Sequence, residues 1–219
     1  MSTRHRSRGM STAEILVGTT LSLVSLAALF TSFRGQERAL ATQTTYAETQ
    51  AVTRSVIDFM LREIRMASYD PTDTALVDAP GPDCPGNEQG IEAATATSIR
   101  FRQDLDGDGA LTTANEDVTY TLVGDELRRI DPVGGTVVLA TGLETSSFRL
   151  RYFNASNPPV ELVPSGTPAS LTSGQRDCVA KVQVTLNALR DNPNPRIQTQ
   201  LHSLATSQVA IRNRALTNF

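Results

Sequence analysis

The sequence predicts an α+β protein, in which one long amino-terminal helix packs on an antiparallel β-sheet. Three observations lead to this prediction. No ionisable side chain occurs from Ile15 to Phe33, and neither proline nor glycine occurs from residue 36 to residue 68. Beyond residue 97, short segments alternate apolar and polar residues, as half-buried strands do. A single helix followed by a run of strands is the α+β pattern.

The first element is a membrane segment behind a basic leader. The leader, residues 1–9, contains three arginines and ends in Gly9. The apolar run Ile15–Phe33 is 19 residues long, which is about 28 Å of helix and close to a bilayer core of about 30 Å. Positive charge flanking such a segment favours the cytoplasmic side. We therefore expect a membrane-spanning helix over residues 10–33.

Glu14 is the only acid in this part of the chain. A carboxylate inside a membrane segment costs about 2.5–3.5 kcal/mol on insertion scales, so it indicates a function. A secretory signal peptide has an apolar run of about 7–15 residues followed by small residues, and Ala27-Ala28 could serve as its cleavage site. A plain single-pass anchor explains the length of the run. Neither alternative explains Glu14.

The spacing from Gly9 to Glu14 resembles the signal of the type IV prepilin family. That signal is a basic leader, a glycine, a processed first residue and a glutamate at the fifth mature position. The resemblance implies that a prepilin peptidase cuts between Gly9 and Met10 and methylates the new amino terminus. It also implies that Glu14 pairs with the amino terminus of a neighbouring subunit. Met10 stands where the family more often has phenylalanine, and Ser11–Ala13 are less apolar than usual.

A second helical segment, residues 34–69, is expected to continue the first. Gly35 and Thr42–Thr45 are positions where the helix could bend, and Asp70-Pro71 is expected to end it, because a residue before proline is disfavoured in helices. Apolar residues recur at helical spacing and form one stripe: Val52, Val56, Phe59, Met60 and Ile64.

Two segments narrow the resemblance to PilW-type minor pilins. The end of the helix, Phe59–Pro71, resembles the helix end of that group, and Val209–Arg214 resembles its last strand. PulJ-type pseudopilins of type II secretion share the same plan and remain a close alternative.

This resemblance implies a pilin-like fold and a structural role in pilus assembly or priming, with adhesion or motility as the process served. The implied partners are other minor and major pilins, the prepilin peptidase and the inner-membrane assembly machinery. The implied location is a single pass in the inner membrane with the head, residues 70–219, in the periplasm. The protein would then enter the extracellular pilus.

The head is expected to consist of strands after a long irregular connection rich in proline and glycine, residues 70–97. Gly124-Asp125 and Gly134-Gly135 are predicted turns. The apolar positions expected on strands are Ile99 and Phe101; Val118, Tyr120 and Leu122; Phe148, Leu150 and Tyr152; Val182, Val184 and Leu186; and Ile197, Leu201, Val209 and Ile211.

An acidic loop in the head is a candidate calcium site. Asp104, Asp106 and Asp108 are followed by Gly109, which resembles the first half of an EF-hand loop. The closing acid is displaced by one position, since Asn115 is twelfth and Glu116 or Asp117 follows. A calcium-binding β-hairpin loop and a solvated acidic turn are the two alternatives. No cofactor other than calcium is expected.

Cys84 and Cys178 are the only cysteines. Outside the cytoplasm two cysteines are more often paired than free, so a structural disulfide is the first interpretation and two thiols the second. Such a bridge would connect the loop after the helix to the strand that begins at Val179, and closing a loop of this size stabilises a protein by about 4.7 kcal/mol on the entropy model.

Charge and motif content argue against two other classes of function. The formal charge is −3, and it becomes −6 when the three leader arginines are removed, so nucleic-acid binding over a general basic surface is not expected. His5 lies in the leader and His202 stands alone in a predicted strand. With no nucleophile signature and no phosphate-binding glycine loop, no enzyme activity is expected. A membrane-tethered calcium-binding protein that does not polymerise remains an alternative to a pilin.

Overall fold

The structure is a computed structural model that describes residues 11–76, 90–143, 146–195, 197 and 199–212. The chain divides into two compact units. The first unit comprises Met1–Thr45 and Asn192–Gln198, and the second comprises Tyr46–Asp191 and Thr199–Phe219.

Helix α1 (Thr12–Arg65) is the longest element of the chain, with 54 residues. It begins after Ser11, whose carbonyl oxygen accepts hydrogen bonds from the amides of Glu14 and Ile15. It runs without interruption through Gly35 and the threonine-rich segment after it. Every residue from 11 to 37 is exposed, so the part of α1 in the first unit presents its apolar side chains outward. The long apolar helix predicted from the sequence is present.

The part of α1 in the second unit is packed on one side only. Seven of its residues are buried: Thr49, Thr53, Val56, Ile57, Met60, Leu61 and Ile64. The helix ends at Arg65, five residues before the predicted stop at Asp70-Pro71. Amides of Met66 and Ala67 bond to carbonyl groups three residues back, and Ser68 has a positive φ of 64°. The amide of Ser68 then donates to the carbonyl of Arg102, so strand contacts replace the helix before the proline is reached.

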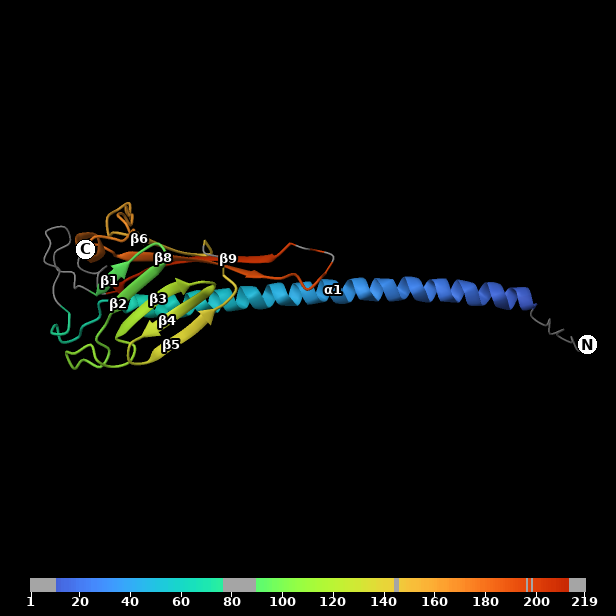
Figure 1. The fold of residues 1–219 in the computed structure, drawn as a ribbon, viewed down its shortest axis with the longest axis horizontal. Coiled ribbons are helices and arrows are strands. Elements are labelled where there is room, and N and C mark those ends of the chain that lie inside the picture. Colours follow the sequence, from blue (N-terminus) through green and yellow to red (C-terminus); the bar gives the residue numbers. More distant parts are fainter. Residues whose placement is uncertain (1–10, 77–89, 144–145, 196, 198, 213–219) are drawn as a thin grey trace, which may run out of the picture. The chain divides into compact units, whose positions relative to one another are not determined.

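The second unit contains two antiparallel sheets, drawn mainly in green to yellow and in orange in Figure 1. The first sheet is a meander in which each strand pairs with the next. Its strands are β1 (Ile91–Ala94), β2 (Ser98–Arg102), β3 (Asp117–Val123), β4 (Glu126–Asp131) and β5 (Gly135–Ala140).

The second sheet has the order β7-β6-β8-β9. Between β7 and β8 lies the short helix α2, whose first turn is closed by a capping box between Thr172 and Gln175. The elements are β6 (Phe148–Phe153), β7 (Glu161–Leu162), α2 (Ser173–Asp177), β8 (Lys181–Arg190) and β9 (Leu201–Ala210).

One hydrophobic core joins these elements. It contains the buried stripe of α1 and the inward-facing residues of both sheets. Phe101 of β2 and Tyr120 of β3 stack within it, with ring centroids 6.1 Å apart. Alternation puts every second residue of β2, β3 and β6 into this core, which confirms the expected strand faces. The α+β class predicted from the sequence is therefore correct.

Other elements match the prediction in part. Both predicted hairpin turns are present, between β3 and β4 and between β4 and β5. The connection 70–97 is not irregular throughout, because β1 occupies its end and pairs with β2. Ile197 lies before β9, whereas Ile211 follows it and is fully buried.

Candidate functional site

Glu14 lies in the first turn of α1, at its third helical residue. Its carboxylate Oε2 accepts a hydrogen bond from the amide of Ser11 at 2.9 Å, while Ser11 Oγ accepts one from Ala13 at 3.3 Å. Helix starts leave several amides without intrahelical partners, and a carboxylate at this position satisfies one of them and favours the positive end of the helix dipole. Glu14 is exposed. Gly9 and Met10 lie outside the described residues.

The three aspartates of the acidic loop lie together. One carboxylate oxygen from each of Asp104, Asp106 and Asp108 can be chosen so that all lie within 4.8 Å of one another. Asp104 is fully buried and accepts hydrogen bonds from the amides of Gly107 and Gly109, at 2.7 and 3.1 Å. Gly109 has a φ of +78°, and a side chain there would also meet Thr74 Oγ1 at 2.5 Å, so glycine is required at this turn.

The acids proposed to close the loop take other roles. Glu116 is fully buried and is not part of the aspartate group; its carboxylate accepts hydrogen bonds from the amides of Leu105 and Thr113. Asp117 is not part of the aspartate group either; its carboxylate accepts hydrogen bonds from Arg100 at 2.8 and 2.5 Å. The loop therefore offers three aspartates as oxygen ligands, which fits a hard cation such as Ca²⁺.

Charge gives a second reason why a cation fits this loop. Among the ion pairs of the described residues, none involves Asp104 or Glu116. A buried carboxylate without a nearby positive charge is costly unless it is hydrogen-bonded or neutralised. Backbone amides meet part of that cost here, and a bound cation would meet more of it.

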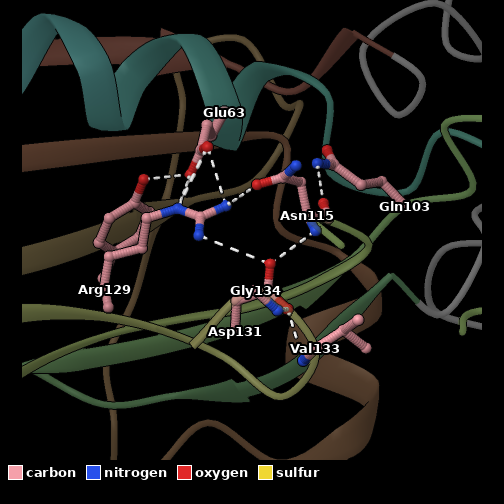
Figure 2. Close-up of polar contacts among 8 residues, drawn as sticks. Glu63, Gln103, Asn115, Arg129, Asp131, Val133 and Gly134 are labelled. Carbon is pink, nitrogen blue, oxygen red and sulfur yellow. Dashed lines mark hydrogen bonds and ion pairs between the residues drawn. The ribbon is translucent and has the colours of Figure 1, made fainter. Parts of the chain in front are cut away.

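A partly buried polar network connects α1 to the first sheet (Figure 2). Glu63 accepts hydrogen bonds from Arg129 Nε at 2.9 Å and Arg129 Nη2 at 3.1 Å, and another from the hydroxyl of Tyr120. Arg129 Nη2 also donates to Asn115 Oδ1 at 2.7 Å, and Nη1 lies 3.6 Å from Asp131. This two-point contact between guanidinium and carboxylate fixes the helix against β3 and β4.

Tyr120 and Asp131 of this network have shifted pKa values. Burial is the main cause that raises the pKa of Tyr120, and the hydrogen bond to Glu63 raises it further. Burial alone would raise the pKa of Asp131, but hydrogen bonds from the amides of Gly134, Asn115 and Val133 outweigh it and hold that pKa below its usual value. The Asp131 carboxylate is thus favoured in its charged form, which also faces Arg129.

Sequence reasoning missed this network, although a signal was present. Leu127, Arg129 and Asp131 occupy alternate positions of β4 and are all buried. An arginine at an inward position of a strand requires a charged partner, and the half-buried Glu63 on the amphipathic helix meets that requirement.

The cysteines and His202 are the remaining residues singled out in the sequence. The predicted pairing of Cys84 with Cys178 stays a prediction, because Cys84 lies outside the described residues. His202 is exposed on β9, opposite Leu189 of β8.

Comparison with known proteins identifies no relative. No family profile matches the chain, and no curated protein and no solved structure is significantly similar to it.

Proposed function

We propose that the protein is a PilW-type minor pilin, a structural subunit that takes part in assembly or priming of a type IV pilus. The proposal depends on one observation: Gly9, Met10 and Glu14 stand at prepilin spacing at the start of a long apolar helix, with Glu14 in its first turn. The fold is compatible with this role, since a helix with an exposed apolar start continues into a β-rich unit.

The exposed start of α1 needs an apolar environment. The helix contains a stretch near the amino terminus that is long and apolar enough to cross a membrane. Large side chains there are widely exposed, for example Leu16 at 68% and Val24 at 68%. In the proposed mechanism, the bilayer covers this surface before assembly, and neighbouring helices cover it in the filament.

Glu14 would set the register of assembly in this mechanism. Cleavage after Gly9 frees a cationic amino group at Met10, and the Glu14 carboxylate of a neighbouring subunit would pair with it. Removing one partner of an ion pair in apolar surroundings strands the other charge, commonly at a cost of about 3–5 kcal/mol. A misplaced subunit would carry that cost, so the pair selects one stagger between helices.

A matched pair of substitutions tests this proposal. Glu14→Gln should abolish recovery of the protein in sheared pili while leaving its membrane level unchanged. Glu37→Gln, an exposed acid further along α1, should leave both unchanged. Equal recovery of the two variants in pili would contradict the assembly role of Glu14.

The pseudopilin alternative uses the same anchor in a type II secretion system. Deleting the gene separates the two machines. Under our proposal the deletion removes surface pili and leaves protein secretion intact. Loss of secretion with normal piliation would assign the chain to the secretion system.

We propose calcium binding by the acidic loop as a second candidate function. One observation in its favour is the grouping of Asp104, Asp106 and Asp108. Another is that Asp104 and Glu116 are buried and that neither takes part in an ion pair among the described residues. The aspartates would supply the ligands, and the buried Glu116 would keep the loop closed through its two amide contacts. This function does not require polymerisation.

Thermal unfolding with calcium and with chelator tests the second candidate. A ligand at about 100 times its dissociation constant stabilises the folded state by about 2.7 kcal/mol, so the unfolding midpoint should rise with calcium. Asp106→Asn/Asp108→Asn should remove the rise, whereas Asp125→Asn in the exposed β3–β4 turn should keep it. The same midpoint with calcium and with chelator would rule the site out.

A further inference from the structure

The solvent faces of the two sheets carry different charge. On the first sheet each outward arginine has an acid beside it: Arg100 binds Asp117, Arg102 lies 3.0 Å from Glu92, and Arg128 lies 2.8 Å from Glu126. Three cations face three acids, so this surface has no net charge.

The second sheet collects positive charge on its solvent face. Strand β6 buries Phe148, Leu150 and Tyr152, so the residues between them point outward. The register of β6, β8 and β9 aligns the outward residues in three rows, which are Arg149–Thr185–Thr206, Arg151–Gln183–Gln208 and Phe153–Lys181–Ala210.

A fourth cation follows the last row along the chain. Arg212 is exposed two residues past Ala210, and the amide between them, that of Ile211, still bonds to Ala180. We call Arg149, Arg151, Lys181 and Arg212 the basic face.

One acid faces these four cations among the described residues of the sheet. Glu161 of β7 pairs with Phe153 in register and binds Arg151, whose Nε lies 2.7 Å from it. This contact is the largest cause that lowers the pKa of Glu161, and the charge of Arg149 lowers it further, which places both arginines near one carboxylate. Counted against the described acids of the sheet, the basic face therefore has a surplus of three positive charges, in a chain whose net charge is −3.

From this placement we propose that the basic face binds the phosphate backbone of single-stranded nucleic acid. Arg149 and Arg151 stand two residues apart on one strand, about 7 Å, and guanidinium groups bind phosphate in a two-point geometry. The side chains of Thr185, Gln183 and Gln208 lie in the same rows as the two arginines and supply further hydrogen bonds. The inference does not depend on the protein being a pilin.

The aromatic content of the face favours a single strand. Phe153 is the one aromatic residue of the three rows, half-buried with the Arg151 guanidinium 5.4 Å from its ring centroid. Sheets that bind unpaired bases stack them on aromatic side chains, and arginine adds cation–π contacts in proteins that bind single strands. Within the three rows Phe153 is the only large apolar side chain, whereas an interface with a protein or a lipid surface is usually richer in them.

Fluorescence anisotropy with the full-length protein in zwitterionic detergent tests the proposal. The probe is a labelled, mixed-sequence DNA single strand of about 20 nucleotides, longer than one such site. Arg149→Gln/Lys181→Gln should weaken binding at least tenfold and reduce the slope of log affinity against log salt by about 2, one for each lost contact. Binding should not depend on base sequence.

The control removes the same charge elsewhere. Arg65→Gln/Arg128→Gln changes two cations outside the basic face and should alter affinity less than twofold, and both double variants should unfold at the wild-type temperature. An equal loss of binding in the two double variants, or no binding by the wild type, would overturn the proposal.

The class of ligand is decided by one variant, Phe153→Leu, and by comparing the single strand with a duplex and with heparin. Phe153→Leu should weaken binding of the single strand about fivefold or more and leave binding of the matching duplex unchanged. Tighter binding of the duplex than of the single strand would overturn the single-strand assignment. Stronger binding of heparin than of DNA would assign the basic face to a sulfated polysaccharide instead.

Discussion

The two parts of α1 differ in what covers their apolar residues. In the first unit, the long apolar stretch of the helix is exposed, with Leu23 at 65% and Leu26 at 61%. In the second unit, Met60 and Ile64 are fully buried although charged residues surround them in sequence. Apolar content alone therefore does not decide burial; the sheets supply partners for one part of the helix only.

This difference separates two tasks within one element. The buried stripe of the second unit stabilises the fold through contacts within the chain. The exposed surface of the first unit contributes nothing to those contacts and is available for a bilayer or for other helices. Substitutions in the second unit should therefore lower the free energy of unfolding, whereas substitutions in the first unit should change contacts with a bilayer or with other helices.

The largest expected effect is a core substitution in the second unit. Met60→Ala should lower the free energy of unfolding by about 3 kcal/mol, since truncating a buried methionine removes apolar contacts and leaves a cavity. Leu23→Ala should leave it unchanged. Urea unfolding of both variants in detergent, followed by far-ultraviolet circular dichroism and tyrosine fluorescence, measures the difference. A similar loss in both would mean that the first unit is packed against protein.

A smaller effect is expected from the buried ion pair. Glu63→Gln should lower the free energy of unfolding by about 2 kcal/mol, because Arg129 loses a charged partner while buried. The matched change Glu14→Gln should have no effect on that transition, since Glu14 is exposed. If Glu63→Gln is as stable as wild type in the same urea titration, the network does not hold the helix to the sheet.

The smallest effect is expected from pH. The Arg100 hydrogen bond is the main cause that lowers the pKa of Asp117, and that of Asp131 is also lowered. A carboxyl whose folded-state pKa is lowered stabilises the fold above its unfolded value of about 3.9 and loses this contribution as pH falls further. The second unit should keep its stability from pH 7 to 5 and lose some below about pH 4.

Urea midpoints at pH 7, 5, 4 and 3 measure this loss. Asp117→Asn should show a shallower decline below pH 4 than wild type. An identical decline in the two proteins would mean that Asp117 does not contribute to acid sensitivity.

Local patterns predicted most of the fold. The apolar run and the stretch without glycine or proline predicted α1, and alternation predicted β2, β3, β6 and β8. The end of the helix was predicted too late. The prediction used the position of Pro71, whereas the helix ends earlier because the Ser68 amide pairs with the carbonyl group of Arg102. Strand β1 was missed since four residues, Ile91–Ala94, are too few for alternation to be recognised.

The candidate sites depended on longer-range contacts to different degrees. Spacing along the chain was enough to group Asp104, Asp106 and Asp108. It was not enough to place Glu116, whose carboxylate binds backbone amides of its own loop. The basic face could not be found from composition, because its cations come from three separate segments of an acidic chain and meet only through strand register.

The amino terminus of the membrane-extracted protein tests the central proposal most directly. We would determine it by mass spectrometry in cells with and without the prepilin peptidase. The proposal predicts a mature chain that begins with N-methylated Met10 when the peptidase is present and an uncut chain when it is absent. A chain that retains Met1 in both, or one cut near Ala28, would contradict assembly as a pilin.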